Sequence, residues 1–413
     1  MRVWNRLDNA AKIFPAASFQ HDTNVFRFYC ELNETIEEEI LQRALDETIE
    51  QFPTYRFIMK RGAFWYYLEQ SEIRPMVHKE EKPPCSAIYD RDEKRLLFEV
   101  TYYRKRINLE VYHVLADGTG ALEFLKFLVY RYLCLKHSNI SSSIELDYDA
   151  SDYQQMDDSF QKYYDSSKKK GNKMRFAYLI KGIKTSDYRL NIIEGIMPVK
   201  AVLNKAHEYK ATLTAFVTAL LLKAIYEEMP YRERKKDVVI SIPVNLRKYF
   251  QSESARNFFS VIPLAYNFSK QSCEFEEMVK YVDAFLKSEL QEEKLKLRIN
   301  ALIGLEKNVI LRIVPLCIKN IVLRIAFRIS EWTDTSTISN LGQVQMPKDL
   351  EKYIDHFGMI VATNKTQIGM CSYKDKLTVG FSSSFLNTDI QRRFFRALSE
   401  MKIPVEIVSN RLE

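Results

Sequence analysis

The fold of this protein is indicated by one short stretch of sequence, YHVLADG at residues 112–118. Apolar and polar residues alternate through residues 107–112, which is typical of a β-strand, and the apolar run at residues 121–135 is typical of a helix. Period two places His113 at the end of the apolar row of the strand, facing inward. An imidazole at a strand end, beside a glycine turn and a helix start, is well placed for proton transfer, and Asp117 is placed to hold the loop.

His113 has two interpretations. It could be a general base, or it could be a buried core histidine whose ring nitrogens are hydrogen-bonded, and the spacing of the motif alone does not decide between them. The order His113-x-x-x-Asp117-Gly118 between a strand and a helix resembles the chloramphenicol acetyltransferase-like superfamily. That group includes plant acyltransferases, alcohol acetyltransferases and the condensation domains of nonribosomal peptide synthetases. Many members have a second histidine just before the motif. Tyr112 stands there instead, which argues against a close relationship to condensation domains; the closest resemblance is to bacterial alcohol acetyltransferase-like proteins.

The resemblance covers nearly the whole chain and implies an α/β fold. We expect two pseudo-symmetric chloramphenicol acetyltransferase-like halves, each a mixed β-sheet with helices, with an active-site tunnel between them. The N-terminal half would span residues 1–187 and carry the motif, and the C-terminal half would span residues 188–413. The polar, poorly periodic residues 137–188 are expected to form a surface crossover between the halves.

A second landmark lies in the C-terminal half. A buried-type strand leads into the turn PVNLR at residues 243–247, and the segment RNFFS follows at residues 256–260. In proteins that this pair of segments resembles, the turn arginine pairs with the aspartate of the histidine motif. The resemblance therefore implies that Arg247 bonds Asp117, ties the halves together and gives the aspartate a structural role. The alternative is an exposed arginine after a strand.

A third landmark is the segment SNLG at residues 339–342. In the bacterial alcohol acetyltransferase-like proteins that it resembles, this segment lies on a strand near the reacting carbonyl. The resemblance implies that Ser339 first, and Asn340 second, donates to a developing oxyanion. The alternative is an ordinary strand end with turn residues.

Composition limits the classes of function. The chain has 413 residues, a net charge of +7, 46% hydrophobic and 28% charged residues, and its cations are spread along the chain, which does not favour nucleic-acid binding. The six cysteines have no metal-type spacing and are expected to be free thiols in a reducing cytoplasm, and the N-terminus lacks the apolar core of a signal peptide. We expect a cytoplasmic monomer with no metal and no permanently bound cofactor.

The segment at residues 309–330 is apolar but interrupted by Pro315 and by cations, which argues against a membrane-spanning helix. Its apolar row consists of Leu311, Val314, Ile318, Ile321, Val322, Ile325 and Ile329. We expect one or two helices, broken near Pro315, that pack on the C-terminal half with this row covered by protein. The alternative is peripheral contact with a membrane surface, to which the basic side chains would be attracted.

Together these features predict an acyltransferase. The resemblance implies transfer of an acyl group, most simply acetyl, from acyl-CoA as co-substrate to a small alcohol or amine, with His113 as general base and no covalent intermediate. One alternative is an enzyme of the same fold that takes its acyl group from an acyl carrier protein. Another is a catalytically silent binding module in which the histidine is purely structural.

Overall fold

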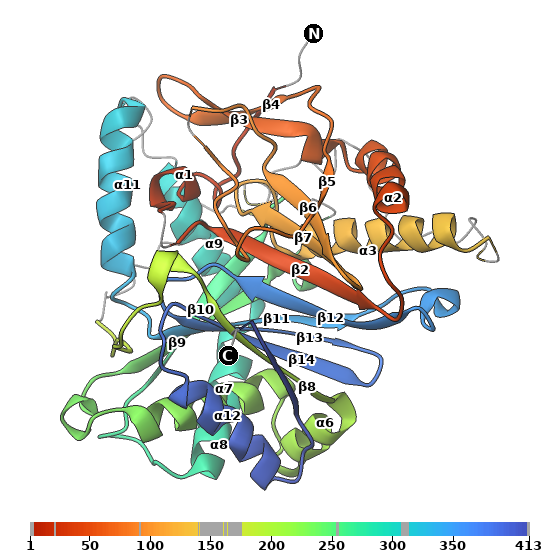
Figure 1. Ribbon diagram of the computed structural model, residues 1–413. Helices are drawn as coiled ribbons and strands as arrows, with labels where there is room; N and C mark the ends of the chain where they lie inside the picture. Colours follow the sequence, from red (N-terminus) through yellow and green to blue (C-terminus); the bar gives the residue numbers. More distant parts are fainter. Residues whose placement is uncertain are drawn as a thin grey trace.

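The computed structural model describes residues 4–19, 22–90, 92–138, 140, 160, 163, 176–252, 256–306 and 314–410. Most of the expected crossover at residues 137–188 lies outside this set, as does Arg312. Two large mixed sheets, each with helices packed on it, form the body of the molecule (Figure 1). The predicted mixed α/β architecture is confirmed.

The first large sheet has five strands in the order β12-β2-β7-β6-β5. Only β5 and β6 pair in parallel; the other neighbours are antiparallel. Its strands are β2 (Val25–Leu32), β5 (Val77–Lys79), β6 (Phe98–Tyr103), β7 (Arg106–Tyr112) and β12 (Ile354–Val361). Its edge strand β12 therefore comes from far along the chain and joins the sheet that holds the histidine motif.

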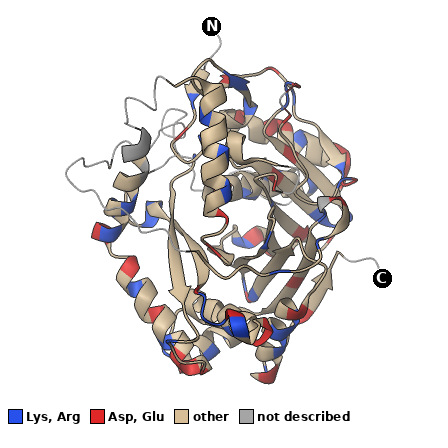
Figure 2. Ribbon diagram, turned by 90° about the vertical axis from the view of Figure 1, so that its left-hand side faces the viewer, with Lys and Arg blue, Asp and Glu red and all other residues tan. Residues whose placement is uncertain are grey.

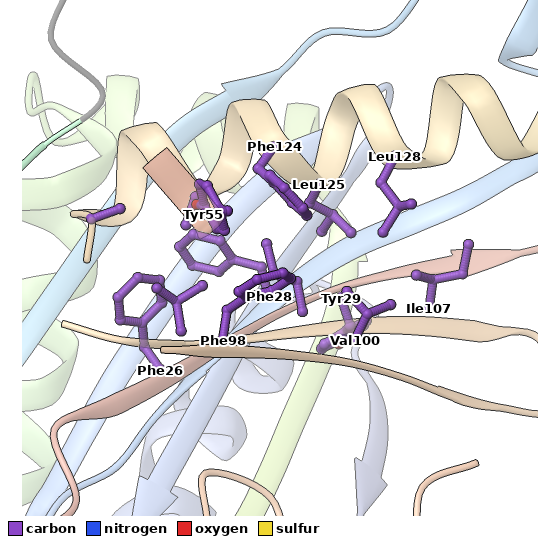
Figure 3. Close-up of a cluster of buried hydrophobic side chains, with 14 of the residues drawn as sticks. Phe26, Phe28, Tyr29, Tyr55, Phe98, Val100, Ile107, Phe124, Leu125 and Leu128 are labelled. Atoms are coloured by element: carbon purple, nitrogen blue, oxygen red, sulfur yellow. The ribbon is translucent and has the colours of Figure 1, made fainter. Parts of the chain in front are cut away.

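Two helices, α2 (Glu38–Gln51) and α3 (Gly118–Lys136), pack together beside this sheet. Figure 3 shows Phe124, Leu125 and Leu128 of α3 directed toward Phe28 and Phe98 of the strands, and all five side chains are at most 3% exposed. This packing fixes α3 against the sheet and so fixes the turn that precedes its first residue.

The strand that leads to the histidine is buried on both faces. Its polar row forms hydrogen bonds inside the protein: Arg27 Nε donates to Glu110 Oε1 at 2.8 Å, and Asn108 Nδ2 donates to Thr101 Oγ1 at 3.2 Å, while Asn108 Oδ1 is buried without a partner among the described residues. One face of β7 therefore packs in an apolar layer, and the other face carries polar side chains that are also buried and do not face solvent.

The second large sheet has seven strands in the order β10-β9-β11-β13-β14-β8-β15. Strand β11 runs parallel to both of its neighbours, and the other pairs are antiparallel. Its strands are β8 (Asn191–Pro198), β9 (Val238–Asn245), β10 (Phe259–Tyr266), β11 (Ser336–Val344), β13 (Thr366–Tyr373), β14 (Lys376–Ser383) and β15 (Glu406–Ser409). Below it in Figure 1 lie α6 (Val199–Glu208), α7 (Leu213–Glu228), α8 (Phe275–Glu289) and α12 (Asp389–Glu400).

Smaller elements complete the described chain. A three-stranded sheet has the order β1-β4-β3, with β1 (Trp4–Arg6), β3 (Phe57–Arg61) and β4 (Tyr66–Gln70). The remaining helices are α1 (Phe14–Ala17), α9 (Glu292–Glu306) and α11 (Leu316–Ser330). Single 3₁₀ turns occur at Pro53–Arg56, Ser186–Tyr188, Tyr231–Glu233, Leu246–Lys248 and Lys348–Leu350.

Helix α11 corrects one prediction. As expected, the helix begins directly after Pro315, but it packs against α1 and the turn between β3 and β4 rather than on the C-terminal part. Its apolar row is not covered by the described protein: Ile321 and Ile325 are 58% and 54% exposed. The reason is that the polar side chains face inward, where Lys319 Nζ donates to a backbone carbonyl and lies over the ring of Trp65. Among the described residues, no helix is long and apolar enough to cross a membrane.

Candidate active site

His113 follows the last residue of β7 and is held from several sides. Its backbone N–H donates to the carbonyl of Asn24 at 2.9 Å. Its ring stacks on Phe14 with centroids 4.8 Å apart and meets the edge of Phe26, also at 4.8 Å; Phe259 of β10 lies 5.8 Å away. Burial lowers the pKa of His113 below its ordinary value of 6.5, outweighing the opposite effects of Asp117 and Asn257. The ring is therefore kept neutral, as a proton acceptor must be.

A neighbouring amide defines which ring nitrogen carries the hydrogen. Asn257 Nδ2 donates to Asp8 Oδ2 at 3.0 Å and to the carbonyl of His113 at 3.1 Å. Both partners are acceptors only, so the amide oxygen must face the ring, where Oδ1 lies 3.3 Å from Nδ1. Nδ1 is then the donor, and Nε2 is the basic nitrogen of the neutral ring.

Asp117 is the N-cap of α3. Its Oδ1 accepts from the backbone N–H groups of Thr119 and Gly120 at 3.1 and 3.0 Å. Its Oδ2 accepts from Arg247 Nη1 at 2.7 Å and from the N–H of Phe258 at 2.9 Å. The expected ion pair with Arg247 is present, and the carboxylate bonds backbone and arginine rather than the imidazole.

Arg247 reaches this position from the turn after β9. Asn245 shapes that turn, because its Oδ1 accepts from the N–H of Arg247 at 3.0 Å. The same amide donates from Nδ2 to Thr119 Oγ1 at 3.0 Å. The turn after β9 is therefore joined to the first turn of α3 by one ion pair and one hydrogen bond, and Gly118 lies between them on the cavity wall.

A cavity of about 360 Å³ opens where the two large sheets meet, and His113 lies in its wall. Its other walls come from β2, β9, β11, β12, α8 and the start of α3, so both sheets contribute. Apolar side chains dominate near the histidine, and two exposed lysines, Lys248 and Lys287, also line the cavity. A larger groove of about 720 Å³ at Asp46, Arg56 and Arg74 has charged walls and lies away from the motif.

Ser339 and Asn340 both lie in the cavity wall, on β11. The amide of Asn340 is committed to neighbours: Nδ2 donates to Thr214 Oγ1 at 3.0 Å, and Oδ1 accepts from the N–H of Gly342 at 2.7 Å. The pairing of β11 with β13 shifts after Asn340, and Gly342 has a φ of +81°. This bulge turns the strand beside the cavity, a common device next to functional sites.

Sequence reasoning missed the residues that position the imidazole. Asp8, fully buried, and the ring of Phe14 come from the first twenty residues, where no motif singles them out. Asn257 stands in the segment RNFFS that was noted as a landmark, but no role was assigned to it. The only signal in the sequence is that Asn257 stands ten positions after Arg247, in the segment that follows the turn.

Within the described residues, no group of three or more His, Cys, Asp or Glu side chains is arranged to hold a metal ion. All six cysteines are unpaired, and Cys30, Cys85 and Cys371 are buried. None of these thiols lines the cavity of the histidine.

These elements define the class of fold: two large mixed sheets with helices, which match the chloramphenicol acetyltransferase-like and condensation-domain fold. No protein-family model matches the sequence, and neither does any curated protein. Among solved structures, the chain is similar to the trichothecene 15-O-acetyltransferase of Fusarium sporotrichioides, with a TM-score of 0.63 and 10% identity over 97% of this chain and 94% of that one.

Two further structures show the same fold. Polyketide synthase associated protein 5 from Mycobacterium tuberculosis has a TM-score of 0.61 and 11% identity, covering 95% of this chain and 96% of that one. The starter condensation domain of rhizomide synthetase, in complex with C8-CoA, has a TM-score of 0.62 and 14% identity, covering 97% and 95%. At these identities the likeness establishes the fold, and activity has to be argued from the residues of this chain.

Proposed function

We propose that this protein is an acyltransferase that moves an acyl group from a CoA thioester to the hydroxyl or amine of a small acceptor. The observation that carries the proposal is the neutral His113, whose Nδ1 faces Asn257 and whose ring forms part of a cavity wall shared by both sheets. A base buried among phenylalanine rings suits the abstraction of a proton from a hydroxyl group in a site with little water.

In the proposed reaction, Nε2 of His113 takes the proton of the acceptor hydroxyl or amine as its oxygen or nitrogen attacks the thioester carbonyl. The carbonyl oxygen becomes negative in the tetrahedral intermediate. When the carbon–sulfur bond breaks, the imidazolium returns its proton to the departing thiolate, so the products are the acylated acceptor and a free thiol. No acyl-enzyme is proposed, because no cysteine lines the cavity.

The developing oxyanion needs a hydrogen-bond donor, and β11 supplies the candidates. The side chain of Asn340 already bonds Thr214 and the backbone of Gly342, which favours the hydroxyl of Ser339 for this role. Asp117 has a supporting role in this proposal, since its four bonds hold the motif turn, the start of α3 and the turn after β9 together.

The nature of the donor is part of the proposal. Lys248 and Lys287 both line the cavity, but Lys287 Nζ pairs with Asp283 Oδ2 at 2.6 Å. Lys248 is therefore the first candidate for contact with the phosphates of CoA, or of the phosphopantetheine arm of an acyl carrier protein. One fold neighbour, the starter condensation domain of rhizomide synthetase, was solved in complex with C8-CoA, which supports a CoA thioester as the donor. Acyl-CoA is the simpler donor, and a carrier protein is the second candidate.

The test measures release of free CoA thiol from acetyl-CoA and longer acyl-CoAs with mixtures of alcohols and amines. We expect His113→Ala to lower turnover by about a hundredfold to ten-thousandfold without loss of folded protein. His78→Ala, at an exposed histidine of β5, is the matched control and should keep the wild-type rate.

Each outcome separates the candidates. Thiol release that survives His113→Ala would overturn the role of the histidine. Transfer from an acylated carrier protein but not from acyl-CoA would identify the second donor. A wild-type protein that binds acyl-CoA, transfers from neither donor and keeps its affinity in His113→Ala would be a silent binding module.

A further inference from the structure

The outward face of α11 is apolar. Four side chains, Ile318, Ile321, Val322 and Ile325, are 51%, 58%, 54% and 54% exposed. Their spacing of three, four and seven residues places them on one side of the helix. We call these four residues the α11 apolar face. A contiguous row of branched aliphatic side chains in water marks a surface that contacts something else.

The helix cannot turn this face inward, because its polar side is fixed to the body. Lys319 Nζ donates to the carbonyl of Phe64 at 3.0 Å and lies 3.5 Å from the ring centroid of Trp65. Asn320 Nδ2 donates to the hydroxyl of Tyr66 at 3.0 Å. The exposed row is thus the consequence of specific bonds on the opposite side of α11.

Charge and aromatic residues surround the face in a particular way. Helix α11 contains Lys319, Arg324 and Arg328 and no acidic residue, and Figure 2, in which it faces the viewer, shows the same. Phe64 beside its start and Trp332 just after its end are 48% and 53% exposed. The helix itself contains no acid, and Glu331 directly after it accepts from Asn364 Nδ2. A basic helix with large aromatic rings at both ends of an aliphatic row is typical of a helix that lies in the interface of a membrane.

We propose that the α11 apolar face docks this protein on an anionic lipid bilayer, with α11 lying in the plane of the headgroups. The aliphatic row would enter the acyl boundary, and Arg328, which is exposed, would meet the anionic headgroups. A second copy of the chain is the less favourable occupant, because a two-fold contact through this face would bring the same cations of two molecules together. The proposal does not depend on the proposed chemistry.

The face lies close to the candidate active site. Helix α11 packs against α1, and Phe14 of α1 stacks on the ring of His113. A membrane bound at the outward face of α11 is therefore separated from the histidine by α11 itself and the short helix α1.

The experiment is co-sedimentation of the full chain with phosphatidylcholine vesicles, with and without phosphatidylserine, at low and high salt. We expect binding to the anionic vesicles that weakens with salt. The double variant Ile321→Glu/Ile325→Glu should lower the partition coefficient by about tenfold or more, because it places charge in the apolar row. Circular dichroism and thermal melting verify that the variant is folded, as expected for exposed positions.

Ile407→Glu is the matched control. Ile407 is 50% exposed on the edge strand β15, away from α11, and its substitution should leave vesicle binding unchanged. Arg328→Glu, at an exposed position of α11, should weaken binding to anionic vesicles specifically. The proposal is overturned if the wild type does not bind anionic vesicles, or if the double variant binds as well as the wild type. A concentration-dependent dimer that the double variant abolishes, without vesicle binding, would instead assign the face to a second copy.

Discussion

At the scale of single residues, Asn257 connects the backbone and the ring of His113 to the buried Asp8. Its amide donates to two acceptors and accepts from the imidazole, so it selects one tautomer of the ring. In Ser-His-Asp sites an aspartate bonds Nδ1 and fixes the orientation and tautomer of the histidine. Asn257 does the same here, but it is neutral and places no negative charge beside the ring. It is a positioning residue rather than a catalytic one.

The pH dependence of the reaction tests this role. The pKa of His113 is lowered by burial, and the neutral ring is the active form, so kcat/KM should fall only as pH drops through a value below 6.5. Asn257→Ala removes a hydrogen bond that favours the protonated ring. The pH at which kcat/KM falls on the acid side of the profile (the acidic limb) should therefore move still lower, and the rate at neutral pH should fall by up to about a hundredfold.

A pH–rate profile measured over the acid range checks this prediction. Asn33→Ala, at an exposed asparagine that donates to the carbonyl of Lys352, serves as the control and should leave the profile unchanged. A purely structural role for Asn257 would lower the melting temperature of the variant but leave the acidic limb where it is in the wild type.

At the scale of secondary-structure elements, β12 depends on a glycine. Gly358 pairs with Tyr29 on β2, and a Cβ at position 358 would overlap the ring and hydroxyl of that tyrosine. Tyr29 has little freedom to move, because its hydroxyl donates to Glu194 Oε1 at 2.6 Å and the guanidinium of Arg106 lies 3.9 Å from its ring centroid. The glycine therefore lets the edge strand approach the sheet.

Gly358→Ala should lower the free energy of unfolding by about 1–3 kcal/mol, the usual cost of overpacking a core. Urea unfolding measures it. Gly182→Ala is the comparison, because Gly182 is exposed and an added Cβ would come no closer than 3.2 Å to its nearest neighbour, the side chain of Phe385; it should cost clearly less stability than Gly358→Ala. Equal effects of the two substitutions would contradict the role given to Gly358.

At the scale of the whole molecule, the two large sheets are joined by several independent links. Strand β12 crosses from the C-terminal part of the chain to the first sheet, Tyr29 of the first sheet bonds Glu194 of the second, and Arg247 bonds Asp117. Asp117 and two residues of β12, Met359 and Val361, line the cavity. Because they bind one sheet to the other, we propose that the two predicted halves unfold as one cooperative unit.

Scanning calorimetry tests that proposal and should show a single transition. Arg247→Met leaves the buried Asp117 carboxylate without its cation and should cost about 3–5 kcal/mol of stability, while lowering activity as the motif turn loosens. Lys248→Met, at the next and exposed position, should have little effect on melting. Two resolved transitions in the wild-type protein would show that the halves fold separately.

The sequence by itself determined those features that depend on residues near one another in the chain. The motif at residues 112–118, the strand before it and the helix after it were all predictable, because a strand period, a turn glycine and a capping aspartate act locally. The resemblance of three short segments was enough to predict the class of fold and the pair formed by Asp117 and Arg247.

Only the tertiary structure decided the rest. Periodicity shows that α11 has an apolar side, but which side is covered depends on partners far along the chain, and here Trp65 and Tyr66 hold the polar side inward. In the same way, the choice of imidazole tautomer needs Asn257 and Asp8, which lie 144 and 105 positions from His113 in the sequence. A local pattern specifies an element and its faces, whereas the surface against which each face packs is a property of the assembled chain.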